Sequence, residues 1–353
     1  MDDDGLGVYG VKIESCYFNG AIPSSWIVRK DIPHWHTNEA DVDQRLKKQR
    51  VEHANIRKIF AVVRSRDKTH VFMEYGEQGL DEYMEADQSA GTSLDSKLVE
   101  FQRLLGLADA VKFLHDEAAD PETLVQEPIR HGDIKAANVV VFKDDAGDTL
   151  WKLSDFGISC IGQSTGRGAS VDQLTFCPPE FMEGIIPPQA KTIKGDVWSM
   201  GCVAMVWLIW LMDGMTGLQA FREACINRPS RATGDSPNRR FFIIESNKLG
   251  AARKLAGGSS TGDFDVTMRT DEGDQRFAMK LNPAIEAYIE GICGDTVSRP
   301  AREKTFVRGV VNALRKTALV PDPDRRGTMM EFCDELKWVL TEVRSDGPQT
   351  GSS

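Results

Sequence analysis

The sequence lacks the cysteine spacing of a disulfide-stapled or zinc-binding protein. Its 353 residues include seven cysteines, and no two of them form a Cys-x-x-Cys pair. An odd number of cysteines without a pattern favours free thiols in a reducing compartment. We therefore expect a cytoplasmic protein, with the nucleus as the alternative location.

Excess positive charge and long apolar runs are missing too. Lys and Arg number 43 against 53 Asp and Glu, and the net charge of -10 disfavours a broad nucleic-acid-binding surface. The longest apolar run, Trp198–Met212, is shorter than the roughly 20 residues that a membrane span needs, so it predicts a buried core helix. The acidic N-terminus does not resemble a signal peptide. We expect neither a nucleic-acid partner nor a membrane partner.

The residue pattern that is present changes from strands to helices along the chain. β-branched and aromatic runs predict strands at 10–18, 24–30, 56–65 and 70–76, with one surface helix at 38–56. Helical spacing predicts helices at 80–84 and 96–117, and helices dominate after residue 180. Residues 139–142 and 149–155 predict a short hairpin. The Gly- and Ser-rich stretch 228–276 predicts a mobile insert, and residues 344–353 a disordered tail.

The stretch HGDIKAANVV, residues 131–140, concentrates the residue types that phosphate transfer from ATP needs. Asp133 can accept the proton of an attacking hydroxyl, Lys135 can reach the transferred phosphate, and Asn138 can ligate Mg²⁺ through its amide oxygen. Asp155 follows at the end of a predicted strand and offers a carboxylate to the same ion. Upstream, Lys30 lies on a predicted strand, and GLGVYG places glycines at 5, 7 and 10 just before the first predicted strand, where backbone N–H groups could approach phosphates.

These segments resemble the motifs of the eukaryotic protein kinase family, of the serine/threonine type. HGDIKAAN resembles the catalytic loop, DFG (155–157) the metal motif, and WIVRK (26–30) the strand with the ATP lysine. Further similar segments follow in the family's order: VEHANI (51–56), VFMEYG (71–76), CPPEF (177–181), GDVWSMG (195–201) and PDPDRRGT (321–328). The resemblance covers about residues 5–340. RRFFIIE and LNPAIEAYIEGI are loosely similar to kinases of filamentous fungi.

The resemblance implies an α+β, two-lobed kinase domain over residues 1–343. Its small, mainly β lobe would be 1–73, its hinge 74–79, and its large, mainly helical lobe 80–343. ATP, Mg²⁺ and protein substrates are the implied ligands and partners, and the oligomeric state is left open. The implied catalytic residues are Asp133 and Lys135, and the implied metal ligands are Asn138 and Asp155. The implied nucleotide-binding residues are Gly5, Gly7, Gly10, Lys30, Met73, Glu74, Tyr75, Gly76 and Val140.

The resemblance also assigns supporting roles. His131 is expected to be a packed core histidine that supports Phe156 and does no chemistry. Asp196 could cap a helix, and the family role is similar, because there it braces the backbone of the catalytic loop. Arg326 is expected to pair with Glu180.

The sequence departs from the family at four places. The strand that leads into the glycine loop is missing. The small-lobe helix carries Gln44 where a Glu would pair with Lys30, unless Asp41 or Asp43 takes that place through a shift in register. Gly132 replaces an Arg that meets an activation-loop phosphate in many kinases, so phosphorylation of Ser164, Thr165, Ser170 or Thr175 is not expected to be required. Gln173 stands where a substrate-side Thr is usual.

Two alternatives to an active protein kinase stay open. A non-catalytic pseudokinase scaffold is favoured by the short start and by Gln44, and is opposed by Asp133, Asn138 and Asp155. A small-molecule kinase of the aminoglycoside or choline type also uses a His-Gly-Asp loop followed by Asn. That family would not be expected to show CPPE and GDVWSMG, so we rank it third.

Overall fold

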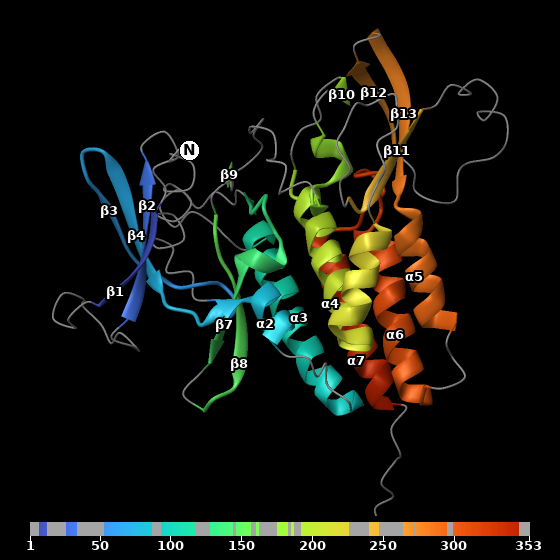
Figure 1. Ribbon diagram of the computed structural model, residues 1–353, viewed down its shortest axis with the longest axis horizontal. Coiled ribbons are helices and arrows are strands. Elements are labelled where there is room, and N and C mark those ends of the chain that lie inside the picture. The colour runs from blue at the N-terminus through green and yellow to red at the C-terminus, as the bar shows by residue number, and fades with distance from the viewer. Residues whose placement is uncertain are drawn as a thin grey trace, which may run out of the picture.

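The computed structural model describes residues 7–12, 26–33, 53–86, 93–116, 128–143, 146–156, 160–161, 175–182, 185–186, 192–225, 240–246, 264–270, 273–294 and 299–345. Over these segments the N-terminal part is mainly β and the C-terminal part mainly helical (Figure 1). The predicted two-lobed α+β architecture is confirmed.

The small lobe is built on one antiparallel sheet, in the order β1-β2-β4-β3. Its strands are β1 (Gly7–Lys12), β2 (Trp26–Pro33), β3 (Ile59–Arg64) and β4 (Lys68–Glu74). The side chains of β4 alternate between buried and half-buried positions, as expected for a strand with one face in a core. Val28, Ile32, Val71 and Met73 form that core.

The glycine segment differs from the expectation. Gly7 was predicted to precede the first strand and Gly10 to stand at its beginning, but both lie within β1, where they pair with Asp31 and Val28 of β2. Gly5 lies outside the described residues. The pairing with β2 extends β1 towards the N-terminus, because the backbone of Gly7–Gly10 finds hydrogen-bond partners there that a local pattern cannot reveal.

The large lobe is organised around one buried helix, α4 (Lys194–Ala224). Trp198, Trp207 and Trp210 are all fully buried along it, and the helix breaks at Gly214, whose φ of 64° favours glycine. By length and composition alone α4 could cross a membrane, but its most apolar window is 67% buried in the protein. The predicted buried core helix at 198–212 is therefore confirmed.

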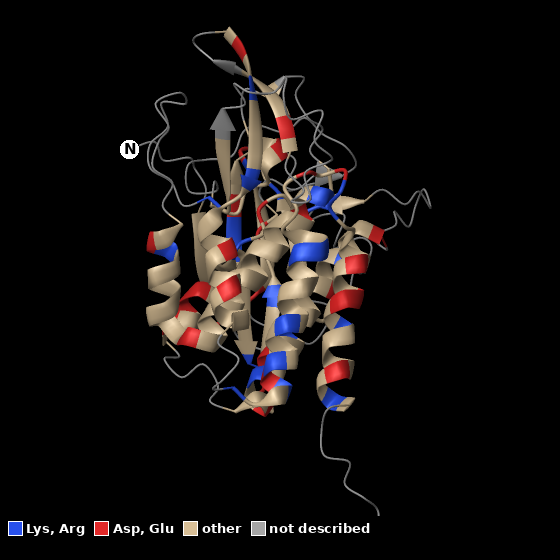
Figure 2. Cartoon of the chain, turned by 90° about the vertical axis from the view of Figure 1, so that its right-hand side faces the viewer, with Lys and Arg blue, Asp and Glu red and all other residues tan. Residues whose placement is uncertain are grey.

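Six shorter helical segments accompany α4 in the described part of this lobe, together with two single 3₁₀ turns. They are α2 (Leu80–Ala86), α3 (Leu94–Asp116), α5 (Pro283–Gly294), α6 (Ala301–Ala313), the π-helical turn η6 (Leu314–Ala318) and α7 (Met329–Ser345). Figure 2 shows blue and red positions, Lys and Arg against Asp and Glu, interspersed along the helices that face the viewer. The predicted helices at 80–84 and 96–117 correspond to α2 and α3.

Several short strands and turns follow the small lobe or lie among the helices of the large lobe. β5 (Gln78–Gly79), β7 (Val139–Lys143) and β8 (Thr149–Leu153) form a three-stranded sheet, which confirms the predicted hairpin. β6 (Ile129–Arg130) pairs with β9 (Cys160–Ile161). The 3₁₀ turns are η2 (Ala136–Asn138) and η4 (Pro179–Phe181).

A second four-stranded sheet occupies much of the predicted mobile insert. β10 (Ile185–Ile186), β12 (Phe264–Thr270), β13 (Gly273–Leu281) and β11 (Phe242–Ser246) pair in that order, above the helices in Figure 1. The expectation of a mobile insert is thus wrong for 240–246, 264–270 and 273–276. The apolar positions of these strands pack on the core, while their Gly- and Ser-rich flanks dominate the composition of the whole stretch.

Candidate active site

The catalytic-loop residues converge between β6 and β7. Lys135 Nζ lies 2.9 Å from Asp133 Oδ2. Asn138 Nδ2 donates to both the backbone oxygen and Oδ2 of Asp133, at 2.8 and 2.9 Å. The turn η2 brings Asn138 back over Asp133, so three residues that the sequence places within six positions form one polar cluster.

A buried carboxylate holds this loop from the side of α4. Asp196 accepts hydrogen bonds from the backbone N–H groups of His131 and Gly132, each at 2.8 Å, and from His115 Nε2 at 3.0 Å. Burial alone would raise the pKa of the Asp196 carboxyl, but its partners, His115 foremost, keep that pKa below the usual value. Gly132 has a φ of 83°, a conformation that glycine adopts without strain. The expected bracing role of Asp196 is confirmed.

His131 is a packed histidine, as expected. Its ring is fully buried, lies 4.8 Å from the ring of Phe156 and bonds the Ser154 carbonyl at 3.1 Å. Burial lowers the pKa of His131, so the ring stays neutral at pH 7. It supports the segment 154–156, and its Nδ1 accepts a hydrogen bond from the backbone N–H of Asp133 at 3.3 Å.

Asp155 and Lys30 meet where the two lobes face each other. Lys30 Nζ on β2 lies 2.9 Å from Asp155 Oδ1, and the Asp155 side chain is 46% exposed. Asp155 has a φ of 64°, which costs an L-residue about 1–3 kcal/mol and is found mainly at functional sites. Gln44, Asp41 and Asp43, the predicted partners of Lys30, lie outside the described residues.

A pocket opens beside this ion pair. Residues from β1, β2, β3 and β4 form one wall, and the segment after β8 forms the other. Its lining consists of Val8, Val28, Lys30, Arg57, Ile59, Met73, Ser154, Asp155 and Phe156. Apolar walls with a few converging polar groups are typical of small-molecule sites. Lys30, Met73 and Asp155, all predicted from the sequence, are part of it.

The predicted hinge residues lie together at the connection between the lobes. Glu74 ends β4 and pairs with Lys152 at 2.7 Å, while the Tyr75 side chain is 49% exposed. Gly76 lies so close to Val140 that a Cβ at this position would overlap the valine side chain. The pocket lining includes Met73, the neighbour of Glu74, but it does not include Glu74, Tyr75, Gly76 or Val140.

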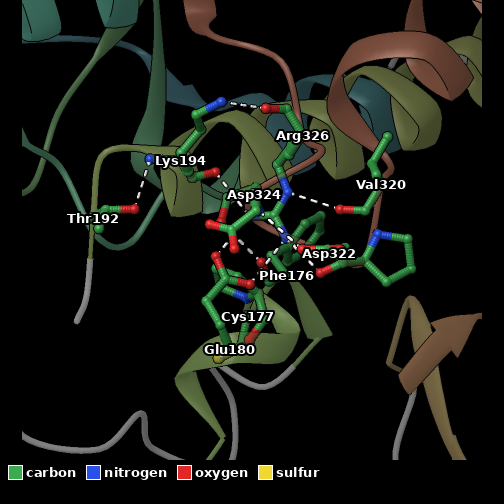
Figure 3. Close-up of polar contacts among 12 residues, drawn as sticks. Phe176, Cys177, Glu180, Thr192, Lys194, Val320, Asp322, Asp324 and Arg326 are labelled. Carbon is green, nitrogen blue, oxygen red and sulfur yellow. Dashed lines mark hydrogen bonds and ion pairs between the residues drawn. The ribbon is translucent and has the colours of Figure 1, made fainter. Parts of the chain in front are cut away.

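A buried ion pair, shown in Figure 3, anchors the turn η4 (Pro179–Phe181), which follows Asp155 in the chain. Arg326 Nη1 and Nη2 bond the Glu180 carboxylate at 2.6 and 2.9 Å, which confirms the predicted pair. Both side chains are almost fully buried. Arg326 also donates to the backbone oxygens of Val320, Pro321 and Lys194, so its guanidinium joins η4, the start of α4 and the segment before α7.

Two polar residues of the pocket were missed by sequence reasoning. Arg57 and Ser154 lie within the predicted strands at 56–65 and 149–155, yet neither was assigned a role. The available signal was a charged residue between Ile56 and Ile59, at the entrance to a strand. A charged side chain at the start of a strand is usually solvated. The role of Arg57 is visible only from its contacts with Glu74 and Ser154 in the folded protein.

Comparisons with known proteins agree with this geometry. The family described as protein kinase domain matches residues 29–215. The serine/threonine-protein kinase CDG1 of Arabidopsis thaliana is 28% identical over 185 residues, which are 51% of this chain and 38% of that protein. The Aurora kinase of Schizosaccharomyces pombe is 26% identical over 186 residues, covering 52% and 44%. The cytokinesis protein sepH of Aspergillus terreus is 27% identical over 224 residues, covering 58% and 14%.

This chain spans less than half of the length of each of these relatives. The family match nevertheless covers more than half of the chain, and it includes Lys30, Asp133, Asn138 and Asp155. With the two-lobed fold and the catalytic cluster in place, the chain belongs to the protein kinase family.

Proposed function

We propose that this protein transfers the γ-phosphate of ATP to Ser or Thr residues of protein substrates, in a reaction that depends on Mg²⁺. The observation that carries the proposal is the cluster of Asp133, Lys135 and Asn138 beside a pocket that contains the Lys30–Asp155 pair. Ser/Thr specificity is supported by Lys135 and by relatives named as serine/threonine kinases. A cytoplasmic location remains part of the proposal.

Each residue has a role that its position supports. Asp133 takes the proton of the substrate hydroxyl, and Lys135 steadies the negative charge of the transferred group. Lys30 meets the α- and β-phosphates, and the backbone at Gly7 and Gly10 covers them from β1.

The oxygen donors of Asn138 and Asp155 fit a hard cation such as Mg²⁺, since Mg²⁺ prefers carboxylate and carbonyl-type oxygens. The half-exposed Asp155 carboxylate leaves room for such an ion. Asn138 and Asp155 would hold Mg²⁺, which would neutralise phosphate charge as it builds up during transfer.

We further propose that activity does not require a phosphate on the activation segment. Gly132 offers no cation to such a phosphate, and the end of the segment has other anchors. Glu180 pairs with Arg326, and Phe181 lies under the Arg130 guanidinium at 5.4 Å. Phe176 stacks on the ring of Phe241, the residue before β11, at 5.9 Å.

The direct test is transfer of labelled γ-phosphate to a generic basic protein in the presence of Mg²⁺. We expect labelled phosphoserine or phosphothreonine on hydrolysis of the product, and loss of label when EDTA removes the metal. A folded protein that binds Mg-ATP without any transfer would contradict the proposal and favour a pseudokinase. Label only on small hydroxylated molecules would favour a small-molecule kinase.

Phosphatase treatment provides the test of phosphate independence. Protein treated with a broad-specificity phosphatase, then freed of it, should keep its rate of transfer to within about twofold, because no phosphate contact is needed to order Thr175–Met182. Mass spectrometry of the treated protein verifies that no phosphate remains. A loss of tenfold or more, restored by a second kinase, would refute this part of the proposal.

A further inference from the structure

Arg57 joins three parts of the molecule that are distant in sequence. Its Nε donates to the backbone oxygen of Glu74, where β4 ends at the hinge, at 2.8 Å. Its Nη1 donates to Ser154 Oγ, just before Asp155, at 3.1 Å. Its backbone N–H bonds the Leu153 oxygen at 2.9 Å. The guanidinium therefore spans the back of the pocket from the hinge to the entrance of the metal segment.

Ser154 is held on three sides. Its N–H donates to the Asn138 oxygen at 2.9 Å, and its carbonyl accepts from His131 Nε2 at 3.1 Å. The third contact is the one from Arg57 to its hydroxyl. The first two come from the large lobe, whereas Arg57 belongs to the segment that leads into the small-lobe strand β3. Of these three contacts, the third links the Ser154 side chain to the hinge.

The residue that follows Ser154 depends on this restraint. Asp155 has a φ of 64°, and such a conformation persists only where the surrounding structure holds it. Its carboxylate is 46% exposed and pairs with Lys30, and the backbone at Ser154 sets the direction in which the Asp155 side chain leaves the main chain. A side chain that hydrogen-bonds a metal ligand directly commonly changes metal affinity or activity by about 10- to 100-fold, and Arg57 acts one residue further from the metal.

The chemistry of arginine suits this bridge. A guanidinium presents several N–H donors in one rigid plane, so Nε and Nη1 can serve two acceptors at once. A lysine ammonium at the end of a flexible chain is a point charge without that fork. Arg57 therefore does more than place a positive charge near the pocket.

We propose that Arg57 is a positioning residue that couples the hinge to the metal ligand Asp155, and so sets the Mg²⁺ dependence of nucleotide use. This inference rests on the proposed Mg-ATP-dependent transfer and deepens it. A ligand in the pocket would contact Met73, the neighbour of Glu74, and so restrain the hinge. Through Arg57, which bonds both Glu74 and Ser154, that restraint would reach Asp155.

The test compares the Mg²⁺ concentration that gives half-maximal transfer in the wild type, Arg57→Met, Arg57→Lys and Ser154→Ala. We expect Arg57→Met to raise it about tenfold, at the lower end of the effect of such partners. Ser154→Ala should raise it in the same direction. The double variant should be no worse than Arg57→Met, because both changes remove the same contact. Arg57→Lys should not restore the wild-type value.

The control is Arg66→Met, which removes an exposed arginine from the same lobe and should leave the Mg²⁺ dependence unchanged. Thermal melting is measured on every variant. If Arg57→Met lowers the melting temperature but keeps the wild-type Mg²⁺ dependence, the residue is only structural and the inference is overturned. Additive effects of Arg57→Met and Ser154→Ala would overturn the coupling through Ser154.

A second measurement separates this inference from the proposed function. Binding of a fluorescent ribose-labelled ATP analogue is titrated with Mg²⁺ in the same variants. If the wild type transfers no phosphate, the proposed function fails, while a tenfold shift of the titration in Arg57→Met still supports the coupling. If the wild type binds the analogue and Arg57→Met shows no shift, the inference alone fails. Absence of Mg²⁺-dependent binding in the wild type overturns both.

Discussion

Replacing Asp133 with Asn should lower the rate of phosphate transfer by about 100- to 10,000-fold, the usual contribution of a positioned general base. Asparagine has almost the same shape but cannot accept the proton of the substrate hydroxyl. The bond from Asn138 to the backbone oxygen of residue 133 does not need the carboxylate, so the loop should stay in place. Steady-state kinetics with a peptide substrate should show the loss in kcat, with KM for ATP nearly unchanged.

The matched control is Asp148→Asn, which neutralises an exposed carboxylate on the turn between β7 and β8. This variant should transfer phosphate at the wild-type rate. Circular dichroism of both variants verifies folding. If Asp133→Asn kept more than a tenth of the wild-type kcat, the proton would have to leave by another route, and the assignment of Asp133 would be wrong.

Replacing Arg326 with Met should lower the free energy of unfolding by about 3–5 kcal/mol, because Glu180 would stay behind as an unpaired buried carboxylate. Both partners are nearly fully buried, and Arg326 also serves three backbone oxygens. Chemical denaturation followed by circular dichroism measures the change. This is the largest stability effect that we expect from a single side chain outside the apolar core.

Two further variants test whether burial of the ion pair causes this loss of stability. Arg326→Met combined with Glu180→Gln should recover part of the loss, since no uncompensated charge is left buried. Arg315→Met breaks the exposed pair with Glu286 and should cost less than about 1 kcal/mol. Equal losses in Arg326→Met and Arg315→Met would show that burial does not set the value of the pair.

The parts that the sequence predicts well are those whose contacts are local or specified by residue type. Asp133, Lys135 and Asn138 converge because a single turn, η2, joins them. The buried helix at 198–212 could be predicted because its apolar run is too short to span a membrane and is stabilised by burial in a protein core. The Arg326–Glu180 pair spans 146 positions, and only the family resemblance made it predictable.

The parts that sequence reasoning missed depend on pairing partners far along the chain. The paired residues of β10 and β12 are 81 and 83 positions apart, and strands of this kind are stabilised by neighbours rather than by intrinsic preference. Gly7 and Gly10 look like loop residues until β2 supplies their partners. Arg57 looks like a surface charge, because the Glu74 carbonyl and the Ser154 hydroxyl that bind it come from other segments.

The hydrogen bonds of Asp196 have a consequence for local unfolding. The loop that carries Asp133 is tied through the amides of His131 and Gly132 to a carboxylate on the most deeply buried helix of the protein. Loops that carry catalytic groups usually belong to the least stable units of a protein, and their amides exchange with solvent through small openings. Here the opening of either amide leaves the buried Asp196 carboxylate one hydrogen bond short, which raises the free energy of opening. We therefore expect the catalytic loop to open mainly together with the core helix.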